Sequence, residues 1–287
     1  MNRIKTAIFL AVFTALFLWL GQALGGHAGM VIALVLAAAM NAGMYWYSDR
    51  IVLRMYRAQE IGPLEAPELH GVVRDLAIRA GLPMPRVYLI PEAAPNAFAT
   101  GRSPEHSSIA VTEGLLSLLS RDEVTGVVAH ELGHIRNRDT LIMTVAATLA
   151  GALSHVANMA IWGAFLGGHS EDDERGHPAA GLLALLIAPV AATLIQMAIS
   201  RAREFLADEA GASISRNPMA LASALRKLES TRHRIPIQHG NPATAHLFIV
   251  NPFTGAGLVK LFSTHPPAEE RIARLESMVR GGVTVLV

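Results

Sequence analysis

Long runs without charged residues dominate the hydropathy pattern of the chain. They occupy residues 7–24, 30–47, 141–168 and 179–199. As helices rising 1.5 Å per residue, these runs are long enough, or nearly so, to cross a hydrocarbon core of about 30 Å. Buried core helices are the alternative, but Trp19 and the Tyr45-Trp46-Tyr47 run are typical of membrane-interface anchors. The pattern therefore predicts a multi-pass membrane protein with four spans.

Basic residues are unevenly distributed between these runs. If all four runs cross, the outer loops are residues 25–29 and 169–178, and they contain only Arg175 of the 24 Lys and Arg residues. Because basic residues concentrate in cytoplasmic segments, both termini and the remaining segments are expected in the cytoplasm. The predicted division is 1–47 for two spans, 48–140 for the first part of a cytoplasmic domain, 141–199 for a transmembrane hairpin, and 200–287 for the second part.

Local signals between the second and third runs predict a small folded unit. Pro67 and Gly81 are typical of the start and end of a helix over 67–80. Short strands are expected at 86–90, 96–100 and 107–111, separated by Pro and Gly. Ser120 and Glu123 form a capping box that starts another helix. The expected class is mainly α with a small β-sheet (α+β).

Composition narrows the chemistry. The chain is 52% hydrophobic and 16% charged, with a net charge of +1, which argues against a nucleic-acid partner. No Gly-rich phosphate loop with a lysine is evident, so no nucleotide is expected. The chain lacks cysteine, so a metal site must use nitrogen and oxygen ligands.

The segment His130-Glu131-Leu132-Gly133-His134 lies within the helix that begins after Ser120. Four residues apart on a helix, the two imidazoles share a face and can bind one ion, while Glu131 lies about 100° around the helix. A solvated histidine pair is the alternative. The motif indicates a zinc site with Glu131 as the acid–base group.

A catalytic zinc needs a third protein ligand and an open position. Glu204 and Asp208 lie one turn apart after the fourth run, so one carboxylate can bind metal while the other accepts an imidazole N–H. An exposed Glu204 paired with Arg201 or Arg203 is the alternative. Packing of the third and fourth spans would bring the two motifs together.

These motifs resemble the HtpX family of bacterial membrane heat-shock proteases. The matching segments are residues 95–101, 130–140, 200–208 and 263–267, together with the four spans. The resemblance implies a gluzincin-like zinc metalloprotease domain, one Zn²⁺ per chain, and Glu204 as the third ligand. It also implies the cell inner membrane, a stress response, and quality control of misfolded or damaged membrane proteins alongside other membrane proteases.

Further site residues follow from the resemblance. The strand residues Asn96, Ala97, Phe98 and Ala99 would form the edge to which an extended substrate adds; an ordinary core strand is the alternative. His265 is a candidate donor to the developing oxyanion, and a turn histidine before Pro266 is the equal alternative.

The resulting hypothesis is a zinc-dependent endopeptidase that uses the lipid bilayer and protein substrates as its partners. Glu131 would take a proton from water and pass it to the leaving amine. A non-catalytic membrane scaffold stabilised by zinc is the alternative, and it would require a fourth protein ligand. A metal transporter would require ionisable ligands within the spans, and these are nearly lacking.

Overall fold

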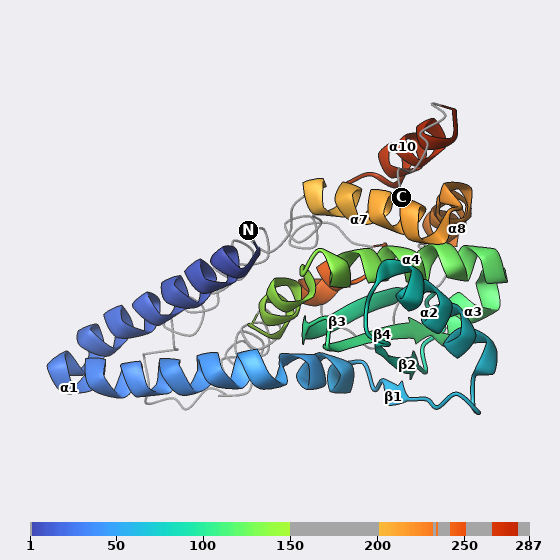
Figure 1. Cartoon of the computed structure of the whole chain (residues 1–287). Coiled ribbons are helices and arrows are strands. Elements are labelled where there is room, and N and C mark those ends of the chain that lie inside the picture. Colours follow the sequence, from blue (N-terminus) through green and yellow to red (C-terminus); the bar gives the residue numbers. More distant parts are fainter. Residues whose placement is uncertain (1, 150–200, 232–233, 235–241, 251–265, 281–287) are drawn as a thin grey trace, which may run out of the picture.

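The computed structural model of the protein describes residues 2–149, 201–231, 234, 242–250 and 266–280 (Figure 1). Its elements are α1 (Asn2–Met55), β1 (Gln59–Glu60), α2 (Pro67–Ala80), β2 (Arg86–Ile90), β3 (Ala97–Ser103), β4 (His106–Thr112), α3 (Glu113–Leu118), α4 (Arg121–Arg136), α7 (Arg201–Ser215), α8 (Pro218–Thr231), the 3-10 helix η1 (Pro242–Leu247) and α10 (Ala268–Arg280). A short apolar helix, Thr140–Leu149, follows α4. The described part is mostly helical with one small sheet, as predicted.

The sheet has the order β1-β2-β4-β3. Strands β2 and β4 are parallel, whereas β1 pairs with β2 and β3 pairs with β4 in antiparallel fashion. The three strands predicted from the sequence are confirmed as β2, β3 and β4, and β1 was not predicted. Strand β3 lies at one edge, directly under α4 in Figure 1.

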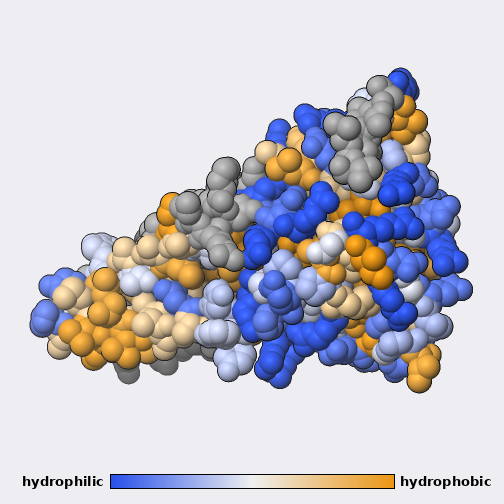
Figure 2. All heavy atoms as spheres, in the orientation of Figure 1, coloured by the Kyte–Doolittle hydropathy of each residue, from blue (hydrophilic) through white to orange (hydrophobic). Residues whose placement is uncertain are grey.

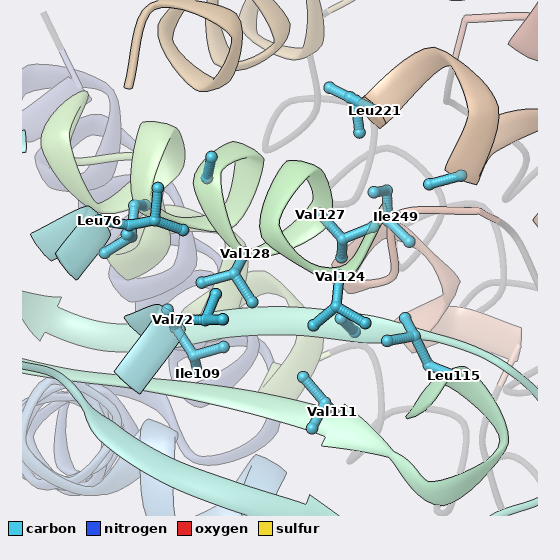
Figure 3. Close-up of a cluster of buried hydrophobic side chains, with 14 of the residues drawn as sticks. Val72, Leu76, Ile109, Val111, Leu115, Val124, Val127, Val128, Leu221 and Ile249 are labelled. Carbon is cyan, nitrogen blue, oxygen red and sulfur yellow. The ribbon is translucent and has the colours of Figure 1, made fainter. Parts of the chain in front are cut away.

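Alternate side chains of the sheet enter two separate cores. One face, including Ile109 and Val111, packs against α2 and α4 through Leu76 and Val128 (Figure 3). The opposite face contacts the end of α1, the Thr140–Leu149 helix and the segment around η1. This second core consists of Val52, Leu53, Tyr56, Tyr88, Ile90, Phe98, Ala110, Met143, Ala147, Leu247 and Phe248. Burial on both faces fixes the register of β3, because a slip of one residue would exchange the two sets.

Helix α1 consists of two helical halves joined at a kink. Gly25 and Gly26 have non-helical backbone angles, and Asn41 of the second half donates to the Thr14 hydroxyl of the first at 2.9 Å. The part Gly25–Met55 is the one helix within the described residues that is long and apolar enough to cross a membrane. Figure 2 shows hydrophobic side chains gathered over α1, away from the sheet. The predicted spans at 141–168 and 179–199 lie outside the described residues, apart from 141–149.

The predicted helix boundaries in the folded unit are confirmed. Helix α2 begins at Pro67, and Gly81 ends it with a left-handed φ of 66°. The Ser120 side chain accepts from the Glu123 backbone N–H, and the Glu123 carboxylate accepts from the Ser120 N–H at 2.7 Å. The capping box therefore fixes where α4 starts, and thereby the position of the histidine motif over the sheet.

Candidate metal centre and active site

The motif helix α4 and the carboxylate helix α7 cross at two glycines. A Cβ on Gly133 would lie 2.9 Å from the Ala207 carbonyl oxygen, and one on Gly211 would lie 2.9 Å from the His130 Cα. Such distances are too short for carbon atoms in van der Waals contact. The two backbones therefore touch, and this close approach carries Glu204 to the histidines.

Three side chains from the two helices converge on one point. The Nε2 atoms of His130 and His134 are 3.2 Å apart, and carboxylate oxygens of Glu204 lie 3.9 Å from the first and 3.6 Å from the second. All three side chains are buried. The structure thus brings together the two histidines of the motif and Glu204, which the family resemblance implied as the third ligand.

The other nitrogen of each imidazole has its own carboxylate partner. His130 Nδ1 lies 2.9 Å from Asp208, and His134 Nδ1 lies 3.3 Å from Asp139. When both imidazoles are neutral and each Nδ1–H donates a hydrogen bond to its carboxylate, both Nε2 atoms carry lone pairs. These two atoms then cannot hydrogen-bond to each other.

A shared cation explains two facing lone pairs at this distance. Two nitrogen ligands at about 2.0–2.1 Å from a tetrahedral zinc lie roughly 3.3 Å apart, and the observed separation is 3.2 Å. The donor set of two imidazoles and a carboxylate fits a divalent metal ion.

The partner Asp139 is positioned by a break in the chain after α4. Helix α4 ends at Arg136 with Asn137 as its C-cap, Arg138 takes a left-handed φ of 58°, and the next helix begins at Thr140. The turn folds the chain back so that Asp139 donates its backbone N–H to the His134 carbonyl at 3.0 Å. The sequence analysis included this segment in the stretch 130–140 that resembles the family, but Asp139 was not predicted as a site residue.

Arg271 of α10 is a second site residue that the sequence analysis missed. Its guanidinium donates to both oxygens of Asp208, at 2.8 and 2.7 Å, and to the Ile249 carbonyl at 2.9 Å. It also lies 3.6 Å from Glu204. Only the tertiary fold reveals this contact, since Arg271 is 63 residues from Asp208.

Glu131 lies beside the ligands, with its carboxylate turned toward β3. Burial raises the pKa of Glu131 to about 7, and a hydrogen bond from the backbone of Ala99 opposes part of that rise. A carboxyl group with a pKa near neutrality can accept and return a proton under physiological conditions.

The two histidines differ in their electrostatic surroundings. Burial lowers the pKa of His130 to about 4 despite its bond to Asp208. Burial acts in the same direction on His134, but the hydrogen bond to Asp139 and the charge of Glu204 outweigh it and raise its pKa to about 9. Metal binding through Nε2 would therefore release the second proton of this imidazole. Burial likewise disfavours an ionised Asp208, yet Arg271 holds the pKa of this carboxyl well below its usual range.

The edge strand β3 lies next to Glu131, and part of its free edge is already paired. The Ala97 carbonyl accepts from the Ile249 N–H at 3.2 Å, and the Asn96 side chain donates to the Val250 carbonyl at 2.8 Å. All four predicted substrate-strand residues are buried. The remaining predicted site residue, His265, lies outside the described residues.

Comparison with known proteins places the chain in a family. The model of peptidase family M48 matches residues 63–279, which include both halves of the metal centre. The chain belongs to peptidase family M48. It is therefore a metalloprotease, and the M48 assignment agrees with the metal-binding geometry described above.

The similarity to individual M48 proteins extends over nearly the whole chain. A protein named Protease HtpX homolog from Syntrophobacter fumaroxidans is 57% identical over 280 residues, covering 96% of this chain and 99% of that protein. One of the same name from Pyrococcus furiosus is 55% identical, covering 96% and 95%. The predicted resemblance to HtpX proteases is thus confirmed.

A solved structure shares the fold. The crystal structure of S. mikatae Ste24p matches with a TM-score of 0.50 at 20% identity, covering 96% of this chain and 63% of that one.

Proposed function

We propose that this M48 protein is a zinc-dependent endopeptidase in which His130, His134 and Glu204 hold the metal and Glu131 moves the proton. The observation that carries the proposal is the convergence of two imidazole Nε2 atoms and one carboxylate, with the carboxyl group of Glu131 held separately beside them. A purely structural zinc site would use a fourth protein ligand, and it would not need a carboxyl group held beside the ligands. The arrangement therefore favours catalysis over the zinc-stabilised scaffold.

In the proposed mechanism, the metal ligands and Glu131 have separate roles. A zinc ion bound by these ligands would supply Lewis acidity, which lowers the pKa of water and polarises the scissile carbonyl. Glu131 accepts the proton released as water attacks, and its buried position, which disfavours the charged carboxylate, favours that proton transfer. It then donates the proton to the leaving amine.

The proposed substrate enters as an extended strand beside β3. Ala97 and Ala99 direct their main-chain groups away from β4, because Asn96 pairs with Thr112 and the bonding positions alternate in an antiparallel ladder. The Ala97 carbonyl is engaged by Ile249. Substrate addition would therefore use the carbonyl of Ala99, next to Glu131, or displace Ile249.

The proposed setting is the bacterial inner membrane. Ile32 and Val35 of α1 are 61% and 63% exposed, and lipid would cover such side chains. We extend this to four spans with both termini and the site in the cytoplasm, following the charge distribution of the loops. The substrates would be misfolded or damaged membrane proteins, cleaved alongside other membrane proteases during stress.

The replacement Glu131→Gln tests the proposed chemistry. It keeps the size of the side chain but removes the proton acceptor, so protein cleavage should fall by about 10² to 10⁴. The zinc content, measured by metal analysis of the protein in detergent, should not change. Glu209→Gln, at an exposed position of α7, is the matched control and should cleave an unfolded test protein normally. Normal cleavage by the Glu131 variant would contradict the assigned role.

A further inference from the structure

The guanidinium of Arg271 is buried against the metal centre from the far side of Asp208. Arg271 is 1% exposed and is among the largest fully buried side chains of the described residues. Three residues along the same helix, Arg274 points outward with its side chain 50% exposed. Transfer of a charged group into the interior is costly unless its partners compensate for the lost water. The partners of Arg271 are therefore the reason for its position.

Those partners connect the C-terminal helix to two metal-site carboxylates. The planar guanidinium of Arg271 donates hydrogen bonds to both oxygens of Asp208, and its Nη1 atom lies 3.6 Å from a Glu204 oxygen. One Asp208 oxygen also faces the Nδ1 atom of His130 at 2.9 Å. The Arg271 Nη2 atom also lies 3.4 Å from both ring nitrogens of His130. Helix α10 therefore contacts the first histidine of α4 directly as well as through Asp208 of α7.

We propose, on the basis of the zinc-protease function above, that Arg271 is a positioning residue that sets the affinity of the metal centre through Asp208. The bidentate grip fixes the plane of the Asp208 carboxylate, because both oxygens are held by one rigid group. A fixed carboxylate in turn holds the His130 ring with its Nε2 lone pair toward His134 and Glu204.

Charge compensation supports the same role. Asp208, Glu204 and Glu131 place three carboxyl groups in one buried region. The Arg271 guanidinium faces two of them, because it donates to both oxygens of Asp208 and lies 3.6 Å from a Glu204 oxygen. Its positive charge offsets part of the repulsion between these carboxylates. The metal site is therefore built from three helices, and α10 acts on it without providing a ligand.

The test is the zinc dissociation constant of the full-length protein in detergent, measured by competition with a chromophoric chelator. Arg271→Gln should bind zinc about 10 to 100 times more weakly than the wild type. Arg271→Lys keeps the charge but loses the fork, so its affinity should fall between the two. Arg280→Gln, on the same helix with its side chain 82% exposed, is the control and should match the wild type.

A double variant tests the route through Asp208. If Arg271 acts by holding Asp208, Asp208→Asn and the double variant with Arg271→Gln should bind zinc equally weakly, because the second change removes nothing further. Additive losses of affinity would overturn this route.

Circular dichroism and thermal unfolding of each variant separate positioning from folding. If Arg271→Gln does not fold, Arg271→Lys decides the question. An Arg271 variant that is folded, less heat-stable and unchanged in zinc affinity would overturn the proposal and leave a purely structural ion pair. A wild-type protein that binds no zinc would instead overturn the proposed function, so the two failures are distinguishable.

Discussion

At the scale of single residues, the site depends on side chains that bind no metal themselves. Asp139 holds the Nδ1 side of His134, as Asp208 does for His130. Each carboxylate selects which nitrogen remains free for the ion. Residues of this kind determine whether the two imidazoles face one point or turn apart.

We expect Asp139→Asn to weaken the metal site. An amide at this position no longer carries the charge that favours the Nδ1–H form of His134, so zinc affinity should fall by about tenfold or more. The measurement is chelator competition in detergent. Asp75→Asn, at an exposed position of α2, should leave the affinity unchanged. Equal zinc binding by both variants would show that Asp139 does not support His134.

The hydrogen bonds of Glu123 predict that the stability of the folded protein depends on pH. Its carboxylate receives hydrogen bonds from Lys227 and Ser223 of α8, both at 2.7 Å. Although burial raises the pKa of Glu123, these bonds and the one from the Ser120 backbone lower it below the ordinary 4.5. A lowered pKa stabilises the folded state above pH 4.5, and this contribution is lost as the pH falls through the lowered value.

We therefore expect Glu123→Gln to lower the free energy of unfolding by about 1 kcal/mol at neutral pH. The difference from the wild type should shrink as the pH falls below 4.5. Thermal unfolding in detergent across pH 3 to 8 measures it, with Glu209→Gln as the exposed control. A difference that stays constant down to the lowest pH would refute the linkage.

At the scale of elements, the crossing of α4 and α7 decides whether the ligands meet. Glycine within a helix costs about 1 kcal/mol relative to alanine, so Gly133 and Gly211 weaken their own helices. The close approach of the two backbones offsets this loss, because it carries Glu204 within reach of both histidines.

Gly211→Ala tests this crossing. The added methyl group would lie 2.9 Å from backbone atoms of His130, which cannot move aside as a side chain can. The helices must separate, so stability should fall by about 1–3 kcal/mol, and zinc affinity should fall with it. Gly71→Ala is the matched control, because nothing lies within 4 Å of the added atom in α2. It should be neutral or stabilising; a neutral Gly211 variant would contradict the tight crossing.

The elements also show which features a sequence can reveal. Pro67, Gly81 and the Ser120–Glu123 pair act on backbone groups within a few residues, so their effects were predictable. The histidine spacing was informative for the same reason. Asp139 depends on a left-handed residue before it, and Arg271 on the packing of α10. The site roles of Asp139 and Arg271 therefore could not be predicted from local sequence patterns.

At the scale of the whole molecule, the proposed four-span topology places residues 169–178 outside the membrane and α10 in the cytoplasm. Because the chain has no cysteine, a single introduced thiol is a unique reporter. Ser170→Cys places it in the predicted outer loop, where a membrane-impermeant maleimide added to intact spheroplasts should label it. Ser277→Cys on α10 is the control and should be labelled only after the membrane is permeabilised. Protection of the thiol at position 170 in intact cells would contradict the four-span topology.

Main chain lies directly against main chain where α4 and α7 cross. A side chain between two helices can change rotamer and let the helices slide past each other. Where backbone contacts backbone, no such rearrangement is available, so the relative position of the two helices is fixed. Each proposed metal ligand lies within about two helical turns of the glycine at which its helix crosses the other. When a peptide substrate binds, we therefore expect the ends of α4 and α7 to move more than the crossing does, so that the positions of the metal ligands do not change.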